Sequence, residues 1–356
     1  MNIYILDTTF REVDILDEFV SVIWTEKYRG YGDFEIYIPL NFKSYMTLRE
    51  DYYLTLQGSK KSMIIETLDI STDKEKGNML VVKGRSLESL LDRRIVWGQK
   101  ALFGNLQEGI NNLLCDAIIE PTEPTRTIPN FVFEISNDPN VTILTVDDQV
   151  TAENLYTVIL QLCEINDLGF EISLKKPSGF TFRLYSGVDR TYDQILTPWV
   201  VFSNEFDNLL TSKQTLDKRY LKTVSLVLGA GEGADRAGAV SQIPSGAGEG
   251  MDRREMYTDG SDIAEEVEGI IVPPEEYVAQ LITKGNKSLA ENTQIEIFDG
   301  QVDTNGIFVY DRDFQLGDIV QIENNFGDMG KARITEVIRT WSATGEEVYP
   351  TFSMIG

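Results

Sequence analysis

Two segments of the chain, Tyr52–Val82 (YYLTLQGSKKSMIIETLDISTDKEKGNMLVV) and Asp318–Phe352 (DIVQIENNFGDMGKARITEVIRTWSATGEEVYPTF), can be laid over each other. In each, a short strand and a polar turn precede a strand that contains Ile-x-Glu, and a charged, glycine-containing turn leads to a last strand. Any two β-meanders share some of this pattern. Because the turn spacing and the central strand agree together, we interpret the segments as parts of two related barrels.

The sequence around the first segment predicts more strands. FVSVIWTEKY, GDFEIYIPL and NMLVVKG alternate or run apolar between glycine or polar turns. Short strands at this spacing indicate a small barrel or sandwich, so residues 1–98 are predicted to be a first β-barrel domain. Ser86 is predicted to cap the start of a short helix at the end of this domain.

Residues 99–203 have a different pattern. Apolar residues recur at helical spacing from Leu106 to Ile118, and a second helix is predicted after Thr151 as N-cap, with Gly169 beyond its end. The segments GFEISLK and GFTFRLYSG follow as a hairpin. This part is predicted to be an α+β inserted domain.

Strands return in residues 204–356, which are predicted to be a second β-barrel domain. A helical insertion is expected at about 262–292, where Pro273 and Pro274 suit a helix start. The predicted fold class is therefore mainly β with α+β inserts: two β-barrel domains and a helix-containing middle domain.

Composition removes several kinds of chemistry. The chain has no histidine, which excludes Ser-His-Asp and Cys-His catalysis and histidine-ligated zinc. It has 57 acidic against 32 basic residues, and no Lys or Arg lies in 127–174 or in 255–283. Such a surface repels phosphate backbones, so tight nucleic-acid binding is not expected. It suits a surface that nucleic acid must slide past, although acidity often serves solubility alone.

Cellular location follows from further absences. Cys115 and Cys163 lie outside any CxxC pair and are predicted to be buried thiols. No apolar run is long enough to span a membrane, and the start, MNIYILDTTFREVDIL, has acids where a signal peptide needs bases. The chain is expected to be made in a cytosol.

A glycine phrase occurs twice, as GAGEGADR at Gly229–Arg236 and as GAGEGMDR at Gly246–Arg253. Neither copy has the lysine of a P-loop, and neither is followed directly by the helix of a Rossmann fingerprint. We interpret the region as a mobile loop between the strands LKTVSLVL and REMYTD, and we predict that it is an assembly element. Arg236 and Arg253 are expected to pair with carboxylates of a neighbour.

Other candidate sites are weak. The acids in Asp138–Asn140, Val146–Asp148 and Asp303–Gly306 lack calcium-loop spacing and are predicted to be solvated turns. Many carboxylate pairs are available for glycosidase-like chemistry, and nothing singles one out. The tryptophans are expected to pack in the core. They are Trp24, Trp97, Trp199 and Trp341.

Several segments in order along the chain resemble the siphophage tail-hub family, which forms the baseplate or tail-tip hub of long-tailed phages and prophages. They are SVIWTEKYRGYGDFEIYIP, MIIE, KGRSLESLLDRRIV, FRLYSGVDR, VVFSNEFDNLL, the glycine region with RREMYTD, LGDIV, and the closing RITEV and VYPTF. Each is weak alone, and together they span nearly the whole chain.

The resemblance implies a ring-shaped homotrimer at the end of the tail tube, with two tube-like β-barrels in each subunit. Its partners would be the distal tail protein ring, the tape measure protein and receptor-binding or fibre proteins, and DNA would pass through without specific binding. It implies a virion protein of the tail tip, assembled in the bacterial cytoplasm. Because the chain ends just after the last predicted barrel strand, a lysin module is expected to be absent or supplied by another protein.

No catalytic, cofactor-binding or metal-binding residue is predicted, and the protein is predicted not to be an enzyme. Two alternatives remain open. One is a tail-associated cell-wall hydrolase of carboxylate type. The other is a receptor-binding or carbohydrate-binding adhesin, which would need exposed aromatic clusters.

Overall fold

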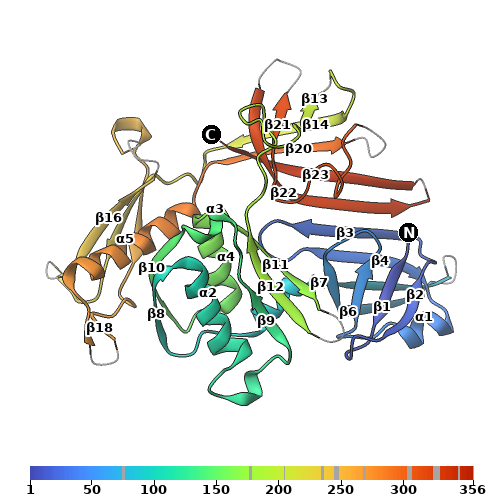
Figure 1. The fold of residues 1–356 in the computed structure, drawn as a ribbon, viewed down its shortest axis with the longest axis horizontal. Coiled ribbons are helices and arrows are strands. Elements are labelled where there is room, and N and C mark those ends of the chain that lie inside the picture. Colours follow the sequence, from blue (N-terminus) through green and yellow to red (C-terminus); the bar gives the residue numbers. More distant parts are fainter. Residues whose placement is uncertain are drawn as a thin grey trace.

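The computed structural model describes residues 1–356 apart from 74–76, 176–178, 204, 234–235, 244–247, 268–269, 303–306, 324–328, 344 and 356. Most of the strands belong to one 13-stranded sheet with the order β14-β20-β23-β22-β3-β4-β7-β6-β5-β1-β2, to which β21 and β13 are added beside β22. In Figure 1 the red strands and the blue strands meet where β22 lies beside β3.

The N-terminal strands of this sheet are β1 (Ile3–Leu6), β2 (Glu12–Leu16), β3 (Ser21–Lys27), β4 (Asp33–Pro39), β5 (Tyr53–Leu56), β6 (Ser62–Asp73) and β7 (Gly77–Ser86). The C-terminal strands are β13 (Val201–Ser203), β14 (Leu209–Asp217), β20 (Ile295–Val302), β21 (Ile319–Glu323), β22 (Met329–Ser342) and β23 (Gly345–Ile355). A short helix, α1 (Phe42–Thr47), separates β4 from β5.

The predicted fold class, mainly β with α+β inserts, is confirmed. Strands from both predicted barrel regions are hydrogen-bonded into the one 13-stranded sheet, and barrel closure is not detected among the described strands. The predicted strands LKTVSLVL and REMYTD belong instead to a separate three-stranded sheet. The N-terminal and C-terminal strands are joined by the pairing of β22 with β3, which a prediction from separate segments does not include. Each half still has a core of its own, one around Trp24 and Ile36 and the other around Phe202 and Phe352.

The two halves repeat one arrangement of strands. The order β3-β4-β7-β6-β5 in the first half matches β14-β20-β23-β22-β21 in the second, with antiparallel pairing throughout. Both long central strands are bulged, β6 between Ile65 and Thr67 and β22 between Ile334 and Glu336. A positive-φ glycine, Gly77 or Gly345, starts the strand that follows each of them. The overlay read from the sequence thus corresponds to two similar β-meanders.

The middle domain lies between β7 and β13 and carries the helices drawn in green in Figure 1. Its main helices are α2 (Leu106–Leu114) and α4 (Leu155–Ile165). Short helices are η1 (Leu87–Arg93), η2 (Cys115–Ile119), η3 (Pro124–Arg126) and α3 (Pro139–Thr142). A two-stranded sheet pairs β8 (Gln99–Asn105) with β10 (Thr145–Thr151), and a three-stranded sheet joins β9 (Phe131–Glu134), β12 (Phe180–Tyr185) and β11 (Gly169–Leu174).

Two predicted helix caps in this region are wrong. Thr151 is the last residue of β10, and the N-cap of α4 is Asn154, whose side chain accepts a hydrogen bond from the Thr157 amide at 3.2 Å. Ser86 precedes η1 without capping it. Its hydroxyl oxygen accepts from the Gly32 amide at 2.9 Å, and the hydroxyl donates to the buried Glu88.

The segment between β14 and β20 holds more than the helix expected at about 262–292. The helix is present as α5 (Pro274–Ala290), which begins at a proline as predicted. It covers a three-stranded sheet of β16 (Gly238–Gln242), β15 (Val224–Leu228) and β17 (Glu255–Asp259), and the short turn η5 (Gly250–Asp252) and the pair β18 (Glu266–Val267) and β19 (Ile270–Ile271) complete it. We call residues 218–294 the insert. In the described part of the chain, no helix is long and apolar enough to cross a membrane.

Candidate functional site

The contact between the two halves is a continuous ladder, which we call the internal seam. Residues 22–27 of β3 pair with 336–341 of β22, from Lys27 opposite Glu336 to Val22 opposite Trp341. Along the seam the side chains alternate between two faces. Val22, Trp24 and Val337 point into the cores and are fully buried, whereas Lys27 and Glu336 form an ion pair at 3.4 Å on the other face.

That other face, which we call the open face, runs across both halves. In one row, the register places Thr340 beside Ile23, Ile23 beside Glu35, and Glu35 beside Lys83. Lys83 pairs with Glu35 at 2.9 Å, and hydrogen bonds from Tyr37 and then Lys83 lower the pKa of the Glu35 carboxyl. Both Lys27 and Lys83 are thereby neutralised by a carboxylate. These two lysines therefore offer phosphate groups little attraction.

Three parts of the molecule, the two halves and the middle domain, meet at Tyr28. Its ring is fully buried, and its hydroxyl lies 3.2 Å from the Asp167 carbonyl oxygen and 3.3 Å from that of Tyr185. Arg29 and Arg333 each lie with the guanidinium carbon 5.2 Å from the centre of this ring, and both pair with the Asp167 carboxylate. Burial raises the pKa of the Tyr28 hydroxyl.

Glycines let the chain pass close to this ring. A Cβ on Gly169 or Gly317 would lie 2.3 Å from the Tyr28 ring, and Gly317 also has φ +89°. A Cβ on Gly187 would lie 1.6 Å from the Gly317 carbonyl oxygen. Side chains at these positions would push the three parts away from each other.

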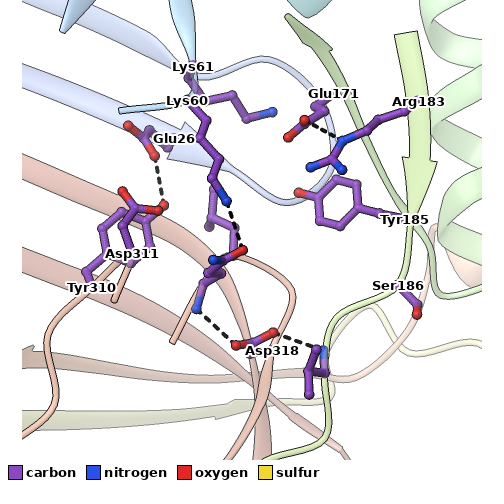
Figure 2. A pocket seen from close by; sticks show the side chains of 13 residues that line it. Glu26, Lys60, Lys61, Glu171, Arg183, Tyr185, Ser186, Tyr310, Asp311 and Asp318 are labelled. Carbon is purple, nitrogen blue, oxygen red and sulfur yellow. Dashed lines mark hydrogen bonds and ion pairs between the residues drawn. The ribbon is translucent and has the colours of Figure 1, made fainter. Parts of the chain in front are cut away.

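A small cavity of about 90 Å³ lies at the same junction and is lined by Tyr185, which accepts a hydrogen bond from Tyr28, and by residues of both halves (Figure 2). Tyr310 donates to Glu26 at 2.7 Å, and Asp318 accepts from Arg190 at 2.6 Å and from the Val188 amide at 2.9 Å. Asp311 faces the same cavity, where burial and the nearby Glu26 raise its pKa to about 6. The cavity is far smaller than the roughly 300–1,000 Å³ of small-molecule sites. The hydrogen bonds of Glu26 and Asp318 beside it connect separate parts of the chain.

The sequence did not single out this junction as a site. Its residues nevertheless lie in the segments that carry the family resemblance: Glu26, Tyr28 and Arg29 in SVIWTEKYRG, Tyr185 and Arg190 in FRLYSGVDR, and Gly317 and Asp318 in LGDIV. The structure brings these distant segments together. The signal available in the sequence was a set of short matches to the family. Each match is weak alone, and the matches contain no common catalytic or ligand-binding pattern.

The acidic turns considered for calcium have structural roles where they are described. Asp138 caps α3 by accepting from the Asn140 amide at 2.9 Å, and the buried Asp148 pairs with Lys287 of α5. The prediction of a solvated turn is therefore wrong for Asp148, whereas Asp303–Gly306 lie outside the described residues. Within the described chain, no group of three or more Cys, Asp or Glu side chains could hold a metal ion.

The two glycine phrases were predicted to form one loop between the strands LKTVSLVL and REMYTD, and this is wrong because the strand β16 lies between them. The first connects β15 to β16, and the second precedes β17, which pairs parallel to β15. Arg236 donates to the Gly229 carbonyl oxygen at 2.7 Å and pairs with Asp259 at 3.1 Å. Arg253 donates to the Gly248 carbonyl oxygen at 3.0 Å and pairs with Glu255 at 2.6 Å. Each arginine thus folds back on its own phrase, and a role in assembly stays a prediction.

Core packing is confirmed for Trp24 and Trp341 and wrong for the other two tryptophans. Trp97 and Trp199 lie outside strands and are about half exposed, against Arg126 and Tyr192 respectively. The two thiols are free. Cys163 is buried, which raises its pKa to about 12, and Cys115 is half-buried.

Comparisons with solved structures show what this fold is similar to. The tail protein from Neisseria meningitidis MC58 aligns with a TM-score of 0.59 at 14% identity, over 99% of this chain and 96% of that one. The prophage tail protein gp18 from Listeria monocytogenes EGD-e aligns with a TM-score of 0.57 at 14% identity, over 99% and 94%. The 43 kDa tail protein of prophage MuSo2 from Shewanella oneidensis aligns with a TM-score of 0.58 at 10% identity, over 100% and 98%.

At such low identity these likenesses show the shared fold. No curated protein sequence matches the chain. A family of siphovirus tail proteins, described as Siphovirus ReqiPepy6 Gp37-like protein, matches residues 2–352. That match covers nearly every residue of both halves, the middle domain and the insert, and the chain therefore belongs to this family of phage tail proteins.

Proposed function

We propose that the protein is the hub at the tip of a siphophage tail, assembled as a homotrimeric ring that closes or extends the tail tube. The observation that carries the proposal is the repeat of five strands within one chain, joined by the internal seam. A tail tube with six-fold symmetry presents six equivalent positions. Three copies of a chain that contains two similar units present six as well.

The open face supports a role in DNA passage. It is continuous across both halves, and Lys27 and Lys83, the cations described above, are paired with carboxylates. With a formal net charge of −25, the chain as a whole repels phosphate. A ring lined by this face would let DNA slide during ejection without holding it.

The cavity supports a structural rather than an enzymatic role. At the junction, Glu26 and Asp318 accept hydrogen bonds that connect separate parts of the chain. We propose a location in the virion, at the tail tip, after assembly in the bacterial cytoplasm. The partners would be the distal tail protein ring, the tape measure protein and receptor-binding or fibre proteins.

Particle images of the purified protein test the hub proposal. Class averages should show rings with three-fold symmetry, and sedimentation should give the mass of three chains. A protein that stays monomeric at high concentration and physiological salt would overturn the proposal. Cleavage of peptidoglycan that is abolished by one carboxylate variant would favour the hydrolase instead.

One observation favours the adhesin as a second candidate. Tyr192 and Trp199 form an exposed aromatic pair with ring centres 5.2 Å apart, and the neighbouring Ile195 and Leu196 are almost fully exposed. Tyr and Trp side chains are enriched at binding interfaces, because each combines an apolar ring with a polar group. Binding of host cell-wall polysaccharide that is lost in Trp199→Ala, and retained in Trp97→Ala, would support this role.

A further inference from the structure

The internal seam defines where a second, intermolecular seam should form, provided that the proposed ring exists. The repeat gives the residue correspondence. In the first half, Ile65 pairs with Gly84 and, after the bulge, Thr67 pairs with Lys83. In the second half, Ile334 pairs with Phe352 and, after the bulge, Glu336 pairs with Thr351. Thr67–Thr72 of β6 therefore correspond to residues 336–341 of β22, which are the residues in the internal seam.

The other strand of the seam has a counterpart too. Starting from Gly84, the ladder leads to Phe34 on β4 and Trp24 on β3. Starting from the equivalent Phe352, it leads to Phe298 on β20 and Gln214 on β14. Trp24 thus corresponds to Gln214, and residues 22–27 of β3 correspond to 212–217 of β14.

The two segments that correspond to the internal seam, Thr67–Thr72 of β6 and residues 212–217 of β14, each have one edge without a strand partner among the described strands. In β22, residues 336–341 are paired on both sides, with β23 and with β3. In β6, Thr67–Thr72 pair with β7 on one side, and the other side has no partner among the described strands, because β5 pairs only with residues 62–64. β14 pairs with β20 and ends the strand order of the sheet.

We propose that β6 of one copy pairs antiparallel with β14 of a second copy of this chain, in the register of the internal seam. Thr67 then lies opposite Asp217, Leu68 opposite Leu216, Asp69 opposite Thr215 and Ser71 opposite Lys213. The contact joins two different surfaces, so it propagates head to tail, and with the three-fold rotation of the proposed hub it closes into a ring. Three internal and three intermolecular seams then alternate around that ring.

Side-chain exposure supports this occupant independently of the repeat. Ile70 is 52% exposed and Leu216 is 61% exposed, although both lie on strands of the large sheet. Alternation places them on the side of the ladder that faces the core in the internal seam, where Trp24 and Val337 are fully buried. The half-buried Leu68 is on this side and already packs against the first core. Exposed apolar edges invite strand pairing, and a second copy in this register covers both edges at once.

Charge on the opposite side agrees with the register. Asp69 and Lys213 are both exposed, and neither has an ion-pair partner among the described residues. In the proposed seam they are diagonal neighbours on the open face, within reach of each other. The intermolecular seam would therefore repeat the Lys27–Glu336 pairing of the internal seam with a different pair of residues.

Disulfide trapping in the full-length chain tests the register. Directly opposite residues lie about 4.5–5.5 Å apart between Cα atoms, within disulfide range, whereas diagonal residues lie about 7–8 Å apart. The double variant Leu68→Cys/Leu216→Cys, in a Cys115→Ser background, should oxidise to a covalent trimer that reducing agent dissolves. The matched control Ile70→Cys/Leu216→Cys uses the same strands and the same side of the ladder, two residues out of register, and should give at least tenfold less.

Sedimentation of the unmodified protein separates the two proposals. A trimer whose 68/216 pair forms no more cross-link than the 70/216 pair would overturn this seam and leave the hub proposal standing. A protein that is monomeric at all concentrations, without cross-links, would overturn the hub and the seam together. A covalent trimer from the 68/216 pair alone supports both.

Discussion

The two halves of the large sheet share five strands in one order and differ in what is attached to them. In the first half, β3 and β4 are joined by a short turn between Lys27 and Asp33. In the second half, the equivalent strands β14 and β20 are separated by the whole insert. The strands that differ, β1 with β2 on one side and β13 on the other, lie at the ends of the shared set. The shared strands thus include those that form the seam, and the halves differ in the connection between β14 and β20 and in the strands at the ends of the shared set.

The two halves are not independent of each other. Both are fixed to the middle domain at Tyr28, through Arg29 from the first half and Arg333 from the second. A chain whose two halves were only weakly joined would unfold in two steps. Because both halves are joined at one junction, we expect this chain to unfold in one step.

The largest expected effect is therefore that of Tyr28→Ala. Removal of a fully buried aromatic ring typically lowers the free energy of unfolding by about 3–5 kcal/mol, and here both arginines also lose the ring that they cover. Denaturant unfolding followed by fluorescence should show one shifted transition. Tyr37→Ala, on the open face, is the matched control and should shift it by less than about 1 kcal/mol. Separate loss of one half would mean that the junction does not couple them.

The next effect concerns the edges that the two halves leave open. Leu216→Glu should weaken the trimer at least tenfold, because it places a carboxylate opposite Leu68 in the proposed seam. The double variant Leu68→Lys/Leu216→Glu should restore much of the affinity, since every seam of a ring then contains both changes. Sedimentation across a concentration series measures this. A double variant that is weaker than either single variant would contradict the register.

Asp311, which lies in the second half, should make the stability of the protein depend on pH. Its pKa is about 6 in the folded chain and about 3.8 when unfolded, so the folded state binds the proton more tightly. Stability from this group is then present at low pH and falls as pH rises from about 4 to 6, by about 1–2 kcal/mol once partial exposure is discounted.

Asp311→Asn should remove that part of the pH dependence and stabilise the protein at pH 7. Asparagine tolerates the positive φ of +66° at this position. Urea unfolding at pH 4, 5, 6 and 7 measures the slope. Asp313→Asn is the control, because hydrogen bonding from Arg312 lowers the pKa of the Asp313 carboxyl. An unchanged slope in Asp311→Asn would show that this carboxyl is already ionised in the folded protein.

Much of the repeat was readable from the sequence because it depends on local signals. Gly77 and Gly345 mark the turns, and the Ile-x-Glu strands mark the centres. The internal seam was not readable, since residues 22–27 and 336–341 meet only in three dimensions and either edge could pair with any other strand. The same holds for Tyr28, whose role depends on Asp167 and Tyr185. Trp97 and Trp199 were misjudged because apolar neighbours in sequence do not establish a strand.

The smallest expected effect concerns the glycine phrase in the insert, the largest difference between the halves. Gly233 has φ +62°, and a Cβ added there would meet nothing within 4 Å beyond its chain neighbours, so Gly233→Ala should cost about 1–2 kcal/mol of local backbone strain and no clash. Gly98, in the middle domain, has φ +73° and the same open surroundings, which makes Gly98→Ala a control of equal strain. If the phrase is an assembly element, both variants should melt alike and only Gly233→Ala should assemble less well in sedimentation. Equal assembly would remove that role. A melting temperature raised by ATP or GTP in the unmodified chain and in Gly98→Ala, but not in Gly233→Ala, would instead make the phrase a phosphate site.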